Sequence, residues 1–262
     1  PTSTREKYGV EAVDRMSPMA ILRAVKKCDM LISGGGSLLQ DVTSSKSLHY
    51  YLSIIRCAEF FHKKVFIYSQ GIGPIDRPGN RRAAAAALKR ADGIVVRDER
   101  SASLLEEIGI ARDKVVITAD PVIRMKKPDG DVGAEILRKA GVSLDGRLTV
   151  GWAIRERDTD SRFVKELLRS IQMMKDKYNA QSVLIPFHYE EDGEVCRHIA
   201  AQLPDDTAVC LNEKYLSEDM LSIIGNMNLL VGVRLHSLIY AAIMGVPLIG
   251  ISYDPKCTAF LN

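Results

Sequence analysis

The sequence predicts an α/β fold with two domains, each built on a parallel β-sheet. Short apolar runs of strand length alternate with longer segments in which apolar residues recur at helical spacing. The alternation continues through both halves of the chain, and strands that are separated by helices pair in parallel. A chain of 262 residues is long enough for two domains of ordinary size.

The first half contains four expected strands and four expected helices. Ser17 followed by Pro18 marks the first helix start, because serine is a good N-cap and proline fits the first helical position. The third helix is alanine-rich, which indicates high helix propensity. The expected helices are 19–27, 46–62, 80–91 and 99–108, and the expected strands are Met30–Ser33, Val65–Gln70, Gly93–Asp98 and Lys114–Thr118.

The second half repeats this pattern after a segment of linker composition. We place the N-terminal domain at 1–123, a linker with one helix at 124–146, and the C-terminal domain at 147–262. The expected strands are Leu148–Ile154, Ser182–Phe187, Ala208–Leu211, Leu229–Val231 and Val246–Ile251, and the helices are 162–177, 190–202, 217–225 and 235–245. A helix precedes the first strand, whereas a doubly wound domain normally opens with a strand, so we expect native residues to be missing at both ends.

Composition excludes several functional classes. The net charge of +3 is too small to indicate nucleic-acid binding, and no apolar run approaches the length of a membrane span. The five cysteines show no metal-ligand spacing and lie in or next to apolar segments, as expected of reduced thiols in a cytoplasmic protein.

Polar or glycine-rich groups follow nearly every expected strand. The carboxyl ends of parallel strands share one edge of an open sheet, and ligands bind at that edge. We therefore expect the ligand site in a cleft between the two domains. The groups at strand ends are Ser33–Ser37, Gln70–Gly73, Arg97, Asp98 and Asp120 in the first half, and Arg155, His188, Arg234, His236 and Tyr253–Lys256 in the second.

Gly34, Gly35 and Gly36, followed by Ser37, predict a backbone that approaches an anion or a sugar closely. The alternative is a tight strand-to-helix turn. The sequence has no P-loop, no Gly-x-Gly-x-x-Gly spacing and no Gly-x-Ser-x-Gly nucleophile elbow. Histidines and carboxylates do not cluster at metal-ligand spacing, so we predict no catalytic metal.

His236 is the best candidate for a general acid or base, because imidazole titrates near neutral pH and this histidine directly follows a strand. Several cations without a metal indicate a small, highly charged anion, such as a phosphate ester that also bears a carboxylate. These cations come from both halves: Arg97, Arg155, Arg234 and Lys256. The alternative is a buried histidine that caps a helix, beside an arginine in a structural ion pair.

Five motifs are specific enough to compare with known families. They are Gly34-Gly-Gly-Ser-Leu-Leu-Gln-Asp41, Ser69-Gln-Gly-Ile-Gly-Pro74, Val96-Arg-Asp98, Ala119-Asp-Pro121 and Arg234-Leu-His-Ser-Leu-Ile-Tyr-Ala-Ala242. In this order and spacing they resemble the polysaccharide pyruvyl transferases over nearly the whole chain. The likeness is strongest to the bacterial branch that modifies a secondary cell-wall polymer, a modification that serves S-layer anchoring.

The resemblance implies a GT-B-like fold of two Rossmann-like domains whose parallel sheets face a central cleft. It implies transfer of a pyruvyl group from phosphoenolpyruvate to two hydroxyls of a sugar, as a cyclic ketal, with release of phosphate and without a cofactor. The acceptor would be a β-linked N-acetylmannosamine of a lipid-linked polymer precursor, and the protein would associate peripherally with the inner membrane face.

The resemblance also assigns roles to residues at matching positions. The donor would meet Arg155, Arg234, Leu235 and His236. The residues that we expect to be catalytic are His236, Arg97 and Lys256, and further substrate contacts are expected from Gly34, Gly35, Gly36, Ser37 and Asp41. In the expected mechanism Arg155, Arg234 and Lys256 neutralise the carboxylate and phosphate of the donor. Protonated His236 then delivers a proton to the methylene carbon of the donor.

Two competing functions remain at this point. A GT-B glycosyltransferase that uses a nucleotide sugar would fit Gly245-Val-Pro247 before the last strand, but residues 237–245 offer no acid for a ribose. A two-lobed protein that binds an anion or a sugar without catalysis is the other alternative.

Overall fold

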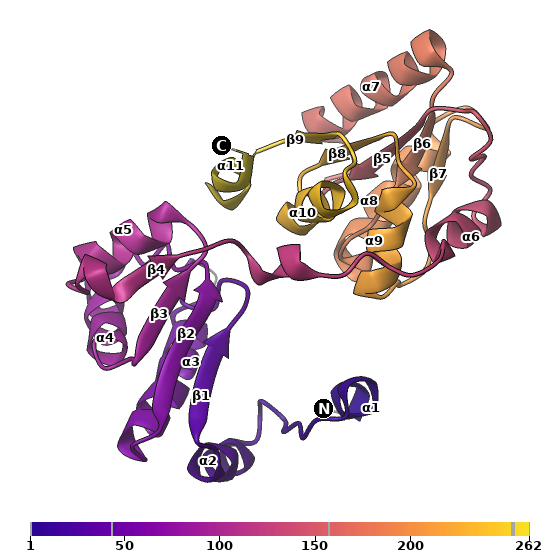
Figure 1. Ribbon diagram of the computed structural model, residues 1–262. Helices are drawn as coiled ribbons and strands as arrows, with labels where there is room; N and C mark the ends of the chain where they lie inside the picture. Colours follow the sequence, from indigo (N-terminus) through magenta and orange to yellow (C-terminus); the bar gives the residue numbers. More distant parts are fainter. Residues whose placement is uncertain (1, 43, 157, 253–254, 262) are drawn as a thin grey trace. The chain divides into compact units, whose positions relative to one another are not determined.

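The computed structural model describes residues 2–42, 44–156, 158–252 and 255–261 of the chain (Figure 1). It divides into two compact units, residues 1–121 and 122–262. Each unit is an α/β domain with one sheet, and every strand pairing in both sheets is parallel. The fold class predicted from the alternation of strands and helices is therefore confirmed.

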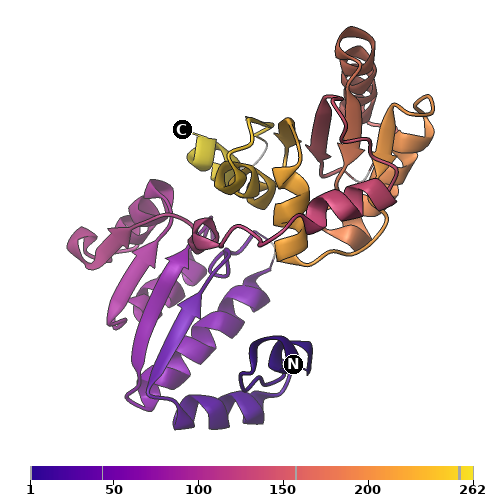
Figure 2. The same ribbon diagram turned by 45° about the vertical axis from the view of Figure 1, so that its right-hand side comes forward.

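The first sheet has the strand order β1-β2-β3-β4, so the chain crosses the sheet in one direction. Right-handed crossovers then place the connecting helices on the same face, and α3 and α4 lie behind the strands in both views (Figures 1 and 2). The elements of this domain are α1 (Thr2–Tyr8), α2 (Pro18–Lys27), β1 (Met30–Gly34), α3 (Ser45–Phe60), β2 (Lys64–Gln70), α4 (Pro78–Leu88), β3 (Gly93–Val96), α5 (Glu99–Glu107), η1 (Arg112–Lys114) and β4 (Val115–Ile117). A 3-10 turn, η2 (Pro121–Arg124), leads out of it.

The opposite face of the first sheet is apolar and exposed. Met30 and Ile32 on β1 are 44% and 60% exposed, and Tyr68 on β2 and Val116 on β4 are 50% and 58% exposed. The register pairs Met30 with Lys64 and Gly34 with Tyr68, so these side chains share one face. Because parallel sheets are ordinarily covered on both faces, this surface is unusual.

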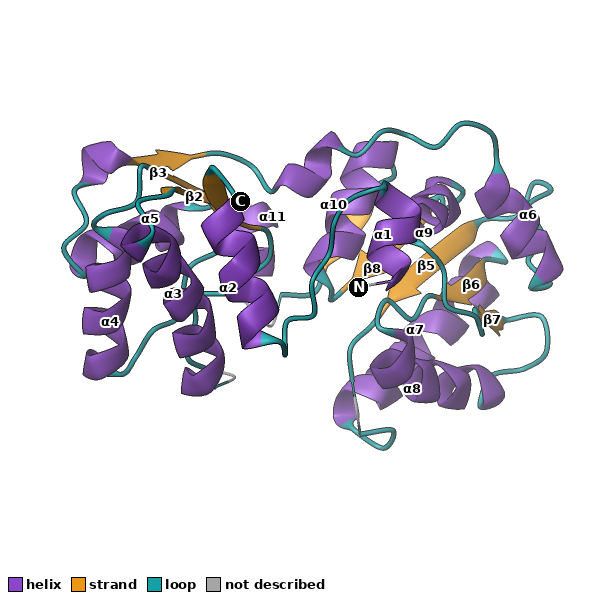
Figure 3. Cartoon of the chain, turned by 90° about the horizontal axis from the view of Figure 1, so that it is seen from below, coloured by secondary structure: helices purple, strands orange, loops and turns teal. Residues whose placement is uncertain are grey.

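The second sheet has the order β7-β6-β5-β8-β9, so the chain reverses direction between β5 and β8. Helices consequently cover both faces: α7 and α8 lie on one side, and α6, α9 and α10 on the other (Figure 3). The elements are α6 (Val132–Lys139), β5 (Thr149–Ala153), α7 (Arg162–Tyr178), β6 (Gln181–Leu184), α8 (Tyr189–Ala201), β7 (Ala208–Cys210), α9 (Ser217–Gly225), β8 (Leu229–Gly232), α10 (Leu235–Met244), β9 (Leu248–Gly250) and α11 (Pro255–Leu261).

Local chemistry sets several helix boundaries. The Asp98 side chain accepts the backbone N–H of Ser101 at the start of α5, and the Ser161 hydroxyl accepts that of Val164 at the start of α7. Helix α4 begins at Pro78, earlier than predicted, because proline is well suited to the first helical turn. The left-handed Gly245 (φ 75°) ends α10.

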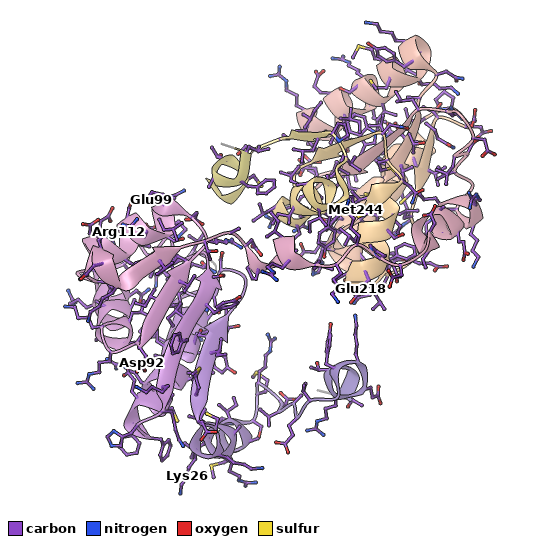
Figure 4. All side chains as sticks on the ribbon, in the orientation of Figure 1. Lys26, Asp92, Glu99, Arg112, Glu218 and Met244 are labelled. Carbon is purple, nitrogen blue, oxygen red and sulfur yellow. The ribbon has the colours of Figure 1, made fainter. Side chains whose placement is uncertain are left out.

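Glycines allow the helices on one face of the second sheet to pack closely. A Cβ on Gly133, in α6, would lie 2.3 Å from the backbone carbonyl of Ser222 in α9. A Cβ on Gly225, at the end of α9, would instead meet the flexible tip of Met244, which is labelled at the end of α10 (Figure 4). The helix that we expected within the linker therefore packs on the second domain.

Gly133→Ala should lower the free energy of unfolding of the second domain by about 1–3 kcal/mol, since backbone atoms cannot move aside for the new methyl group. Gly225→Ala is the matched control and should have an effect near zero, because the Met244 side chain can change rotamer. Trp152, the only tryptophan of the chain, lies on β5 and reports on this domain during denaturant unfolding. Equal losses in the two variants would contradict the packing argument.

Candidate active site

The carboxyl ends of β5 and β8 bring two predicted arginines to the same edge of the second sheet. Ala153 pairs with Gly232 in the β5–β8 register, and Arg155 and Arg234 each stand two residues beyond these partners. The strand order reverses between the same two strands. Ligands of open α/β sheets bind at the carboxyl edge beside such a reversal, so the structure places this pair where a ligand site is expected.

Helix α10 follows shortly after β8 in the chain and carries the other residues that we expect to bind the donor substrate. Arg234 is the N-cap residue, and Leu235 and His236 form the first turn. The close start requires Gly232, because a Cβ there would lie 2.5 Å from the Ser237 hydroxyl. Buried Ser237 in turn donates its hydroxyl to the Arg234 carbonyl at 2.6 Å. His236 remains exposed, which excludes the alternative of a buried histidine.

The guanidinium of Arg234 forms a close contact with one carboxylate at the start of α8 and a longer contact with another. Its Nη2 lies 2.5 Å from Oδ1 of Asp192 and 3.5 Å from Oε2 of Glu191. Its Nε is buried without a hydrogen-bond partner among the described residues, while the side chain as a whole is 20% exposed. An unsatisfied buried donor costs free energy, so the position of Arg234 is not explained by internal hydrogen bonding alone.

Asp192 is a site residue that the sequence did not single out. It is only 1% exposed, and its Oδ2 accepts the backbone N–H of His188 at 2.9 Å. The carboxylate therefore connects the segment after β6 to the segment after β8. In the sequence it follows two other acids at a helix start, where acids are favourable because of the helix dipole. Nothing in the sequence therefore distinguished Asp192 from its two acidic neighbours.

The first domain gathers a second set of predicted residues at the carboxyl edge of its own sheet. Arg97 follows β3, and its side chain is 6% exposed. Its Nη1 donates to Oδ2 of Asp120 at 2.7 Å, and its Nη2 donates to the Ser37 hydroxyl at 3.0 Å. A Cβ on Gly71 would lie 2.8 Å from this guanidinium, so glycine is needed there. The arginine thus ties the loop after β1 to the segment after β4.

The triple glycine forms the tight turn after β1. Gly35 and Gly36 have φ values of 76° and 62°, which residues other than glycine rarely adopt. The Gly36 carbonyl accepts the N–H of Gly71 at 3.0 Å. Buried Gln70 donates from Nε2 to the Ser33 hydroxyl at 2.9 Å, while its Oε1 has no partner in the described chain. The tight turn that the sequence offered as the alternative is therefore present, whereas a close approach of this backbone to an anion or a sugar stays a prediction.

Asp41 belongs to a buried network within the same domain. Its Oδ1 accepts the backbone N–H of Asp76, and its Oδ2 accepts the N–H of Arg77 and the amide of Asn80. Burial raises the pKa of the Asp41 carboxyl, but these hydrogen bonds outweigh it and the pKa lies below its ordinary value. The contacts give Asp41 a structural role in the loop before α4, and its predicted contact with substrate is untested.

The remaining expectations concern metals, membranes and Lys256. Lys256 lies near the start of α11, but its side chain falls outside the described residues. Within the described residues no three histidine, cysteine or carboxylate side chains are grouped to hold a metal ion. No helix in the described ranges combines the length and hydropathy needed to cross a membrane.

Comparison with known proteins identifies the family. The family described as "Polysaccharide pyruvyl transferase" matches residues 1–255. The chain belongs to this family. It is also 22% identical over 248 residues to the amylovoran biosynthesis protein AmsJ of Erwinia amylovora, a match that covers 88% of this chain and 58% of AmsJ. The chain therefore spans somewhat more than half the length of that relative.

Solved structures of UDP-sugar proteins share the fold. The UDP-GlcNAc 2-epimerase of Methanocaldococcus jannaschii matches with a TM-score of 0.67 and 13% identity, covering 96% of this chain and 73% of the epimerase. Anabaena HepE in complex with UDP-glucose matches with a TM-score of 0.59 and 11% identity, covering 95% and 69%. At these identities the similarity concerns the fold of two Rossmann-like domains and not the ligand.

Asp41→Asn should destabilise the first domain by about 2 kcal/mol at pH 7, because it removes the charge that three donors share. A folded-state pKa below the ordinary value stabilises the fold above pH 4, and this contribution disappears as pH falls. The difference between wild type and variant should therefore shrink from about pH 5 to pH 2. Circular dichroism measures the unfolding. Exposed Asp76→Asn is the control, and a pH-independent difference would contradict the network.

Proposed function

We propose that this protein transfers a pyruvyl group from phosphoenolpyruvate to two hydroxyls of a sugar, forming a cyclic ketal and releasing phosphate. The observation that carries the proposal is the pair of arginines at equivalent positions beyond β5 and β8, with exposed His236 on the adjoining helical turn. Membership of the polysaccharide pyruvyl transferase family supports the transferred group. The use of phosphoenolpyruvate is our inference from the two arginines at this edge and from the resemblance of the sequence motifs to the family.

The proposed donor site uses Arg155 and Arg234 to bind carboxylate and phosphate oxygens. A guanidinium can hold two oxygens of one anion at once, which fixes the orientation of the donor. Leu235 contributes the first turn of α10, whose N-terminal end favours negative charge. Lys256, near the start of α11, is proposed as a further cation on the basis of sequence alone.

The proposed chemistry begins with proton transfer from His236 to the methylene carbon of the enol. The central carbon then carries an oxocarbenium-like positive charge, and one sugar hydroxyl adds to it with loss of its proton. Departure of phosphate restores the electrophilic centre, and the second hydroxyl closes the ring with loss of a second proton. Of the two protons released, one restores protonated His236 and the other leaves with the phosphate. A positioned acid of this kind contributes about 100-fold to 10,000-fold in rate.

The acceptor is proposed to meet the first domain at Gly34–Ser37. Glycine backbone at a strand end can approach a sugar closely, and Arg97 holds Ser37 in place there. In this proposal Arg97 supports catalysis by holding this loop in place for the acceptor. We propose a β-N-acetylmannosamine of a lipid-linked secondary cell-wall polymer precursor as acceptor, handled by a cytoplasmic protein at the inner membrane face.

The alternative with its own support is a glycosyltransferase that uses a nucleotide sugar, since HepE of the same fold was solved with UDP-glucose. Incubation of the protein with phosphoenolpyruvate and candidate acceptors distinguishes the two functions. Pyruvyl transfer should give one phosphate per ketal and a mass gain of one pyruvyl ketal on the acceptor. Glycosyl transfer from UDP-glucose with no ketal product would replace the proposal.

Arg234→Lys should weaken phosphoenolpyruvate binding by about 1–3 kcal/mol, because an ammonium cannot reproduce the planar set of guanidinium donors. Calorimetric titration measures the affinity. Arg169→Lys is the matched control, since this exposed arginine of α7 pairs only with Glu166 among the contacts described. Wild-type affinity in Arg234→Lys would exclude a direct contact with the donor.

His236→Gln should reduce turnover by about 100-fold or more while leaving the melting temperature nearly unchanged, because the side chain is exposed. Wild-type activity should also fall as pH rises through the titration of this imidazole, since the acid must begin protonated. His188→Gln is the comparison, because the backbone of His188, and not its imidazole, bonds Asp192. Undiminished turnover in His236→Gln would remove the assignment and direct attention to Lys256.

A further inference from the structure

The first turn of α8 carries three acids, of which one is buried. Glu190 and Glu191 are exposed, and Glu190 pairs with Lys214 at the surface at 3.1 Å. Asp192 is buried and forms its two contacts inside the domain. The helix start therefore has two acids that suit its dipole and one whose place is set by its partners.

The partners of Asp192 lie on the two sides of the strand reversal. Its Oδ2 accepts the His188 backbone N–H after β6, and its Oδ1 meets Nη2 of Arg234 after β8. Strands β6 and β8 both flank β5, so the carboxylate spans the carboxyl end of β5. Arg234 is thereby held at the point where Arg155 emerges from the sheet.

We propose that Asp192 is a positioning residue that fixes the guanidinium of Arg234 for the anionic donor. A free arginine samples many rotamers, and ordering it at the moment of binding would cost affinity. A guanidinium already held through Nη2 avoids this cost, and the exposed part of the side chain stays accessible to an oxyanion. The identity of that anion rests on the proposed function, but the fixing of Arg234 does not.

Fold stability by itself is a weaker explanation of this contact. A buried ion pair adds little net stability compared with apolar residues of the same size, because both groups lose their hydration. Among the described residues the Nε of Arg234 also has no hydrogen-bond partner, although a purely structural arginine would be expected to satisfy it. An ion pair that leaves this N–H unsatisfied is better explained if the orientation of Arg234 is needed for binding a ligand.

The decisive comparison is Asp192→Asn against Glu191→Gln, two isosteric changes at neighbouring acids that both lie near Nη2 of Arg234. In Asp192→Asn the KM for phosphoenolpyruvate should rise about 10-fold or more, the scale of one charge-assisted hydrogen bond, with kcat at saturation little changed. Glu191→Gln should stay within about 2-fold of wild type, since its contact is longer and exposed. A merely structural Asp192 would lower the active fraction and hence kcat, leaving KM unchanged.

Nuclear magnetic resonance of the arginine side chains provides a test that needs no substrate. In wild type the Nη groups of Arg234 should give separate signals, because the contact with Asp192 restricts rotation of the guanidinium. Arg234→Lys assigns these signals by their loss. In Asp192→Asn they should merge, as in freely rotating arginines, while in Glu191→Gln they should stay separate.

The two measurements keep this inference distinct from the proposed function. If wild type forms no ketal, the function fails, and the arginine spectrum still decides whether Asp192 fixes Arg234. If wild type forms the ketal but Asp192→Asn keeps both the KM and the separate signals, the positioning role is overturned. If Asp192→Asn does not fold, the wild-type spectrum decides alone, and a freely rotating Arg234 refutes the proposal.

Discussion

The reversal of strand order between β5 and β8 is the constraint on which the candidate donor site depends. From β5 the chain continues to β6 and β7 through helices on one face of the sheet. It then returns to β8, on the other side of β5, and continues to β9 through helices on the opposite face. The crossovers therefore diverge at this point and leave the carboxyl edge open between them. Arg155 and Arg234, far apart in sequence, become neighbours because each follows one of these two strands.

The cations that the sequence grouped together occupy different electrostatic environments. The Arg97 side chain is buried against Asp120, Arg234 forms an ion pair with Asp192, and Arg155 is exposed. The charges of Arg97 and Arg234 are therefore partly balanced by carboxylates before any ligand binds. Selectivity for an anion must then come from the directions of the remaining donors, which favours a ligand of defined shape over anions in general.

The sequence predicts the existence of both sheets and the residues at their edges. A short apolar run indicates a buried strand, and the polar group after it marks the carboxyl end of that strand. It does not predict strand order, since apolar runs do not identify their neighbours. Asp192 was missed because only tertiary packing separates it from the acids beside it. Asp41 was found through a family motif and Arg97 through its place at a strand end. Neither signal identifies the partners of a side chain, and both side chains prove to be engaged within the first domain.

The exposed apolar face of the first sheet has a consequence for how this polypeptide behaves in water. Side chains such as Ile32 and Tyr68 form an ordered apolar surface beside β1, which is also an edge strand in the described sheet. Such a surface attracts any complementary apolar surface, and an open strand edge invites backbone pairing with another chain. Solubilising substitutions therefore belong on that face of the first domain, at residues that take no part in the proposed chemistry.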